Sequence, residues 1–125
     1  MKKASSILLL FLLIFSVSAL AQPKYVIGQK TAPKELTLPE WQQYKELQTN
    51  DPLVKISSFS IRFVLYDRDM EIVSTTSAIS EEMYEGIELL SKMGEDPRDF
   101  YIDKVVATKN GKPIQLPQHK IHLVK

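Results

Sequence analysis

The C-terminal segment of the chain constrains the fold more than any other part of the sequence. An apolar run with high β-propensity, residues 100–106, leads into Asn-Gly at residues 110–111, a dipeptide whose residues tolerate positive φ angles. This pattern is typical of a β-hairpin. The return segment, residues 112–116, contains Pro113, which has no backbone N–H to donate to a strand ladder. We therefore expect an edge or irregular strand there, and a chain that ends in sheet.

Residues 53–66 predict the central strand of that sheet. Val54 and Ile56 are out of phase with the alternation that follows, so we expect a β-bulge or a bend at Ser57-Ser58. Residues 67–69 are typical of a turn, and a shorter strand is expected to begin at Met70. Four large apolar side chains of the central strand share one face: Phe59, Ile61, Phe63 and Leu65.

A short amphipathic helix is predicted between the N-terminal residues and the central strand. Thr37 and Glu40 have the spacing of a capping box, in which each side chain bonds the backbone of the other residue. Leu36, just before the cap, can pack on Trp41 and fix the start of the helix. The apolar spacing extends this helix over residues 38–48, before Asn-Asp-Pro ends it.

A second helix is predicted after Ser80. Its apolar residues Met83, Ile87 and Leu90 line one face, and glutamates occupy the other. Gly86 costs roughly 1 kcal/mol against alanine inside a helix, so its presence indicates a close packing contact. Gly94 is expected to close the helix in the left-handed αL conformation.

These elements predict an α+β, mostly β fold class. The expected architecture is an antiparallel sheet or an immunoglobulin-like sandwich with one or two short helices packed on it. The core is expected at the in-phase apolar positions of each element: Phe59, Ile61, Phe63, Leu65, Met83, Ile87, Leu90, Ile102, Val105 and Leu123.

The N-terminal residues have the three-part layout of a secretory signal peptide. Lysines at residues 2 and 3 precede an apolar run over residues 7–15, and an A-x-A site at residues 19–21 follows, so we expect cleavage after Ala21. The apolar run is shorter than the roughly 20 residues that a spanning helix needs, which disfavours the alternative of an uncleaved anchor. We expect the mature protein in the periplasm, or secreted as the alternative, without a membrane span.

After the signal peptide, residues 1–21, the sequence divides into three segments. We expect an extended N-terminal arm over residues 22–36, a short helix and linker over residues 37–52, and a β-rich domain over residues 53–125. Removing the signal peptide changes the formal net charge from +1 to −1. No net field then favours nucleic acid or an anionic membrane, and we expect neither as a partner.

The residue types that usually carry catalysis or bind metals form no recognisable motif. The chain has no cysteine, and its four glycines are too dispersed for a phosphate-binding loop. His119 and His122 are expected to point to opposite faces of a strand. Residues 67–78 lack the glycine and the final glutamate of a calcium-binding loop. We therefore expect no enzyme and no cofactor or metal site, with a hydrolase whose site is assembled from unsignalled residues as the alternative.

Three segments occur in a characteristic order: SFSIRF in the central strand, GIELLSKMG in the second helix, and YIDKVVATKNGKPIQLPQHKIHLVK in the closing strands. This order resembles the C-terminal domain of the GldM/PorM family over about residues 53–125. Members of that family are periplasmic parts of the type IX secretion and gliding-motility machinery of Bacteroidetes. The resemblance implies a β-rich domain that binds other proteins of the cell envelope.

We therefore expect a non-enzymatic interaction domain whose partner is another envelope protein or a second copy of the chain. Candidate contact residues are Trp41 and Tyr44 on the first helix, because these side chains supply large anchors at interfaces. Pro113 and Ile114 are candidates on the edge strand, where unpaired backbone groups can accept a partner. Burial of Trp41 in the domain's own core is the alternative for that residue. A small secreted binder or inhibitor would use the same surfaces.

Overall fold

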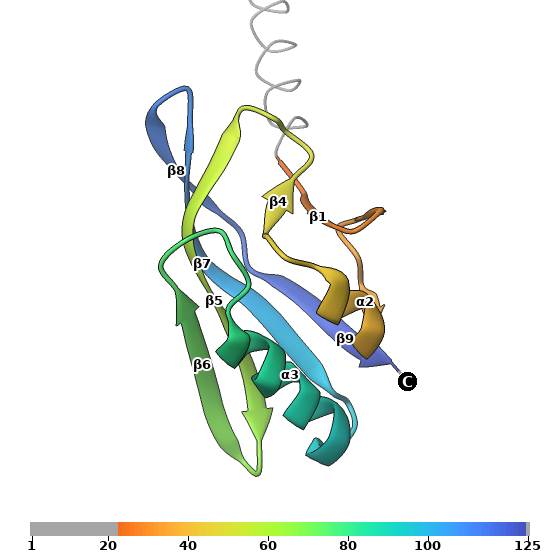
Figure 1. Ribbon diagram of the computed structural model, residues 1–125. Coiled ribbons are helices and arrows are strands. Elements are labelled where there is room, and N and C mark those ends of the chain that lie inside the picture. The colour runs from red at the N-terminus through yellow and green to blue at the C-terminus, as the bar shows by residue number, and fades with distance from the viewer. Residues whose placement is uncertain (1–22, 125) are drawn as a thin grey trace, which may run out of the picture.

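The computed structural model describes residues 23–124, so the predicted signal peptide and its cleavage site lie outside the described residues. Strands predominate, and two short helices accompany them, which confirms the expected α+β, mostly β fold class (Figure 1). The elements are β1 (Tyr25–Ile27), β2 (Lys30–Thr31), β3 (Glu35–Thr37), α2 (Leu38–Gln43), β4 (Gln48–Thr49), β5 (Val54–Leu65), β6 (Arg68–Ser74), α3 (Glu81–Met93), β7 (Asp99–Lys109), β8 (Lys112–Leu116) and β9 (His119–Val124).

A six-stranded sheet forms the main layer. Its strand order is β3-β9-β7-β5-β6, and β8 pairs with β7 beyond the end of β9. All of these pairs are antiparallel except β3 with β9, so the sheet is mixed. A three-stranded sheet, β2-β1-β4, lies beside it. Both helices lie on one face of the large sheet (Figure 1), and the opposite face carries mostly exposed or half-buried side chains.

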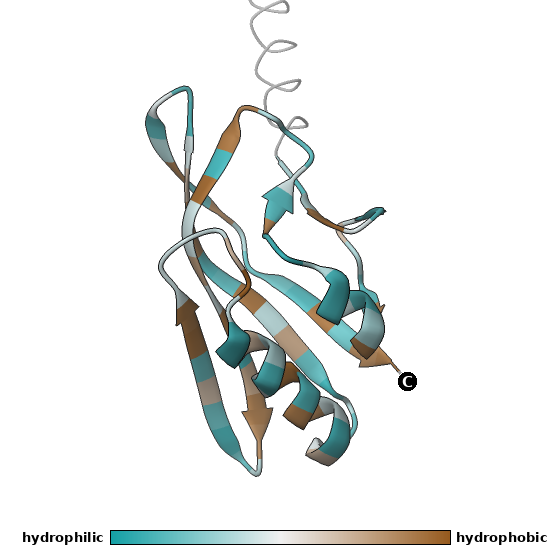
Figure 2. Ribbon diagram, viewed as in Figure 1, coloured by the Kyte–Doolittle hydropathy of each residue, from teal (hydrophilic) through white to brown (hydrophobic). Residues whose placement is uncertain are grey.

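The core lies between the large sheet and the helices. Hydrophobic and hydrophilic residues alternate along β5 and β7 (Figure 2), as a sheet with one covered face requires. All of the core positions predicted from the sequence are buried. Gly86 lies where α3 crosses β5 and β6: a Cβ atom there would be 2.8 Å from Ile72 Cδ1 and 3.1 Å from Phe63 Cζ. The predicted close contact at Gly86 is therefore confirmed.

The N-terminal segment belongs to the same core. Tyr25 and Ile27 of β1 and Leu36 of β3 are buried in the hydrophobic cluster that contains the residues of β5, α3 and β7. β3 pairs in parallel with β9, with Leu36 opposite Leu123. The arm, the first helix and the β-rich segment distinguished in the sequence are therefore parts of one folded unit.

Two β-bulges compensate each other in the central pair of strands. Between Ile56 and Ser58, β5 has one residue more than β7, and between Ser58 and Ser60, β7 has one residue more than β5. The first bulge, at Ser57, was predicted from the change of phase. The second contains Lys104, whose φ of 49° is rare for a residue with a side chain. Together the bulges restore the register, and they increase the local twist of the sheet.

Helix α2 begins as predicted but ends earlier. The capping box is present: Glu40 N donates to Thr37 Oγ1 at 3.3 Å, and Thr37 N donates to Glu40 Oε1 at 3.1 Å. The helix ends at Gln43, so the extension to residue 48 was wrong. Tyr44 leaves the helix with extended backbone angles because its hydroxyl donates to Val26 O at 2.6 Å and accepts from Gln48 N at 2.7 Å. Tertiary contacts thus outweigh local helix propensity here.

Gly94 closes α3, but not in the predicted αL conformation. Its φ is −73° and its ψ is 150°, an extended geometry open to any residue. A Cβ atom at this position would lie 2.5 Å from the carbonyl oxygen of Leu90 and 2.8 Å from Leu90 Cδ1. The αL prediction was therefore wrong, and glycine is required at residue 94 for space instead of for its backbone freedom.

Replacing Gly94 by alanine is therefore expected to destabilise the protein by about 1–3 kcal/mol, the usual cost of overpacking. Asparagine separates this explanation from the αL one, because it is tolerated in αL caps but is larger than alanine. We expect Gly94→Asn to cost at least as much as Gly94→Ala in a denaturant titration. A smaller loss with asparagine would show that the cap depends on backbone conformation.

Candidate interaction surface

Trp41, the aromatic residue of α2, is not available to a partner. Trp41 is fully buried, and its ring packs edge-on against Phe100 with 5.1 Å between ring centroids. Tyr44 and Tyr84 lie next to it, with centroids 6.3 and 6.4 Å away. The expectation that Trp41 contacts a partner is therefore corrected. The side chain lies in the core, which was the alternative prediction for this residue.

Tyr44 is also buried, and its hydrogen bonds join three segments of the chain. Its hydroxyl is bound to Val26 and Gln48, and its carbonyl oxygen accepts from the hydroxyl of Tyr84. Burial raises the pKa of the Tyr44 hydroxyl above its ordinary value. Tyr44 therefore holds β1, α2 and α3 together, and the expectation that it contacts a partner is also corrected.

The β8 edge is exposed, as predicted, but proline limits what it can bind. The hairpin turn at residues 110–111 is flanked by Lys109 and Lys112, which form its hydrogen-bonded pair. Because such pairs alternate in an antiparallel ladder, Pro113 occupies a non-hydrogen-bonded position and its nitrogen points away from β7. Pro113 thus removes an outward donor and protects this edge. Ile114 packs partly buried against the core.

The β6 edge is longer and carries no such protection. Within residues 23–124, β6 pairs only with β5, over seven residues in continuous register and without a bulge or proline. Its turn, Tyr66-Asp67, has positive φ angles at both residues, so the flanking pair is hydrogen-bonded and the alternation continues from it. The outward-pointing backbone groups are therefore those of Asp69, Glu71 and Val73.

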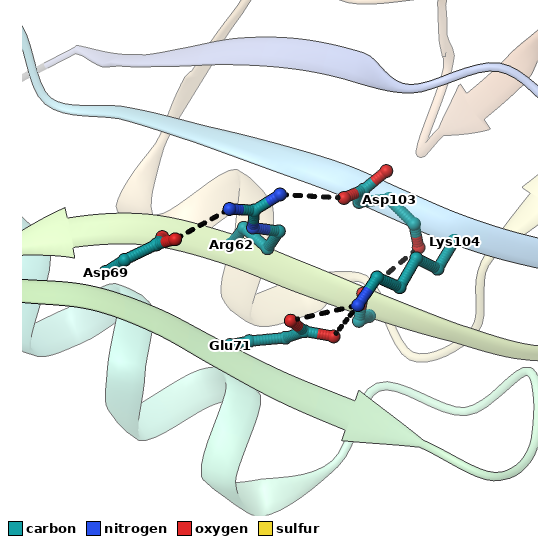
Figure 3. Close-up of polar contacts among 6 residues, drawn as sticks. Arg62, Asp69, Glu71, Asp103 and Lys104 are labelled. Carbon is teal, nitrogen blue, oxygen red and sulfur yellow. Dashed lines mark hydrogen bonds and ion pairs between the residues drawn. The ribbon is translucent and has the colours of Figure 1, made fainter.

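Charged residues cover the open face of the sheet beside this edge (Figure 3). Arg62 on β5 contacts Asp69 Oδ2 on β6 at 2.6 Å through Nη2 and Asp103 Oδ2 on β7 at 3.4 Å through Nη1. Lys104 Nζ reaches over β5 to Glu71 Oε1 at 2.9 Å, because the bulge turns its side chain across the face. The bonds that Arg62 donates to Asp69 and, second, to Asp103 raise the pKa of its guanidinium.

The two histidines of β9 have separate hydrogen-bond partners. His119 Nε2 lies 2.7 Å from the carbonyl oxygen of Pro33, and His122 Nδ1 lies 2.8 Å from Asp99 Oδ1. The two residues are three positions apart in the strand, and this odd spacing places them on opposite faces, as expected. Among the described residues, no three His, Cys, Asp or Glu side chains gather in a way that could hold a metal ion.

A groove of about 510 Å³ lies between β4 and the first residues of β5. Its titratable groups are Glu46, Asp51 and Lys55. The hydrogen bond from Lys109, whose Nζ is 2.8 Å from Asp51 Oδ2, lowers the pKa of the Asp51 carboxyl. The Ser77 hydroxyl donates to Glu46 Oε1 at 3.0 Å, but histidine, the usual base for a serine nucleophile, does not line this groove. These groups do not make a hydrolytic constellation.

Comparison with known proteins does not assign a family. No protein-family model matches the chain, and no curated protein matches its sequence. In the part of the chain that the structure describes, no helix has the length and hydropathy needed to cross a bilayer. Support for a candidate site therefore comes from the geometry of the sheet alone.

The β6 site was missed in the sequence because an isolated strand pattern does not reveal its neighbours. Residues 68–74 contain neither proline nor glycine, which was the available signal for an unprotected strand. Whether that strand lies inside the sheet or at its edge depends on the pairing order. Arg62 likewise has no local signature, since its partners lie on two other strands.

Proposed function

We propose that this chain is an exported, non-enzymatic interaction domain that binds another protein of the cell envelope through strand β6. The observation that carries the proposal is the seven-residue outer edge of β6, which has no strand partner within residues 23–124. Folded proteins usually protect such edges with prolines, bulges, charged side chains, short strands or covering elements, and of these β6 has charged side chains. β8 has Pro113, whereas β6 has no proline and no bulge.

Strand addition is the binding mode that fits this edge. A partner strand would bond the outward N–H and C=O groups of Asp69, Glu71 and Val73, and its side chains would lie over both faces of the sheet. The resemblance to the GldM/PorM C-terminal domain supports an envelope partner and suggests type IX secretion or gliding motility as the setting. The predicted signal peptide supports a periplasmic location.

Position-specific crosslinking in the organism of origin tests this proposal. A photoreactive residue at Val73, which is 60% exposed on β6, is compared with the same residue at Val106, which is 42% exposed on β7. We expect Val73 to give an adduct with an envelope protein in the periplasmic fraction, and Val106 to give none. Equal adducts at both positions, or no adduct at Val73, would refute binding through β6. An adduct recovered only from the medium would instead favour a secreted binder.

A further inference from the structure

We infer that the partner presents β6 with an extended segment that has basic side chains at alternate positions on one face and apolar side chains on the other. This inference rests on the proposed function, because it names the chemistry of the strand that β6 accepts. It follows from the side chains at the β6 edge, because those on the open face of the sheet differ in charge and polarity from those on the helix-covered face.

On the open face, both charged side chains that β6 presents are acidic, Asp69 and Glu71. Within residues 23–124, Arg62 pairs with Asp69 and with Asp103 of β7, and Lys104 pairs with Glu71, so these three carboxylates have two cations as ion-pair partners (Figure 3). Asp69 keeps 61% of its side chain exposed, and a carboxylate can accept further hydrogen bonds beyond the one from Arg62. A strand added to β6 would place alternate side chains next to Asp69 and Glu71. Lysine or arginine at those positions would be attracted to these edge carboxylates.

On the helix-covered face, the middle of the same edge is apolar, between Arg68 and Ser74. Gly86 of α3 contacts Ile72 of β6, and the helical spacing puts Glu82, Leu89 and Met93 on the stripe that passes through Gly86. Leu89 is 42% exposed and Met93 is 52% exposed. Met70, on the same face of β6, is also exposed. Apolar side chains of the added strand would cover these groups and remove them from water.

A second copy of the chain does not fit this edge. Two β6 strands related by a two-fold axis pair over their full length only with Glu71 opposite Glu71, because this residue is the centre of the strand. Like charges directly opposite each other destabilise a strand pair. Shifted registers shorten the ladder. The charge of β6 therefore selects a different, basic strand.

The test uses the folded chain and two synthetic peptides, one alternating lysine with valine and the other alternating glutamate with valine. We expect the lysine peptide to bind, more weakly as salt rises, and the glutamate peptide to bind at least about tenfold more weakly. Hydrogen exchange should show new protection of the outward N–H groups of β6. Equal affinity for both peptides, or protection elsewhere, would overturn the inference.

Proline substitution checks the binding mode. Val73→Pro removes one outward N–H of β6 but keeps the ladder to β5, as Pro113 does in β8. We expect about tenfold weaker binding of the lysine peptide, consistent with the loss of a backbone hydrogen bond and its neighbours. Gln115→Pro, at the corresponding outward position of β8, is the matched control and should leave binding unchanged. An unchanged affinity in Val73→Pro would contradict strand addition.

Asp69→Lys is the second variant, which stays informative if Val73→Pro does not fold. This variant should bind the lysine peptide more weakly and the glutamate peptide more tightly than the unchanged protein does. Affinities that do not change in this way would contradict the inference. If neither peptide binds but the photoreactive residue at Val73 still crosslinks to a protein in cells, the inference of a basic partner segment is refuted and the proposed function stands. Loss of the Val73 crosslink would refute the function itself. Self-association of the chain that Asp69→Lys abolishes would show that a second copy is the occupant.

Discussion

Replacing Trp41 by alanine is expected to destabilise the protein by about 3–5 kcal/mol, the usual range for removing a buried aromatic side chain. The ring is fully buried and packs on Phe100, Tyr44 and Tyr84, so its loss leaves a cavity where α2, α3 and the sheet meet. A domain of this size has a total stability of about 5–15 kcal/mol. Denaturant titration should therefore show a large fall in the transition midpoint.

Trp41→Phe is the matched control for this prediction. The indole Nε1 of Trp41 is buried and has no hydrogen-bond partner within the described structure. Phenylalanine keeps most of the aromatic contact and removes an unsatisfied donor, so we expect a much smaller loss than with alanine. An alanine variant with unchanged stability but a lost partner would contradict the core position of Trp41 and restore the interface hypothesis.

The second large effect is expected at Phe63, where alanine should also cost about 3–5 kcal/mol. Phe63 is buried on β5, and its ring lies against Gly86 at the crossing of α3 with the sheet. Alanine would leave this crossing unfilled because Gly86 has no side chain to move into the space.

Val64 provides the comparison for Phe63 in the same strand. It is adjacent in sequence but points to the open face and is 60% exposed. We expect Val64→Ala to change the free energy of unfolding by no more than about 0.5 kcal/mol. If Phe63→Ala lowers the free energy of unfolding by less than about 1 kcal/mol, then Phe63 does not lie on the face of β5 that packs in the core.

The parts of the fold that could be predicted are those encoded by neighbouring residues. Alternation along β5 gave its buried face, the Thr37–Glu40 pair gave the start of α2, and Asn110-Gly111 gave the β7–β8 hairpin. In each case the residues that make the signal also make the contact. These elements can therefore be predicted from neighbouring residues, without knowing which distant segments pack against them.

The remaining features depend on partners that are distant in sequence. α2 stops at Gln43 because the Tyr44 hydroxyl binds Val26 in β1, and β3 forms because β9 pairs with it. Lys104 has no sequence signal for a positive φ, since its bulge compensates one on another strand. The same limit applies to the candidate site: the sequence left open whether Trp41 contacts a partner or lies in the core, and the free edge of β6 was not recognised.

The position of β9 determines when β3 can join the large sheet. This strand lies between β3 and β7, with Leu123 opposite Leu36 and Ile121 opposite Phe100. A chain that is still being synthesised lacks residues 119–124, so β3 has no neighbour in the large sheet and one side of β7 stays open. Ordering the N-terminal segment early would cost conformational entropy without the contacts that offset it. We therefore expect the N-terminal segment to join the large sheet only after residues 119–124 are present, so this order of assembly links the two ends of the described chain.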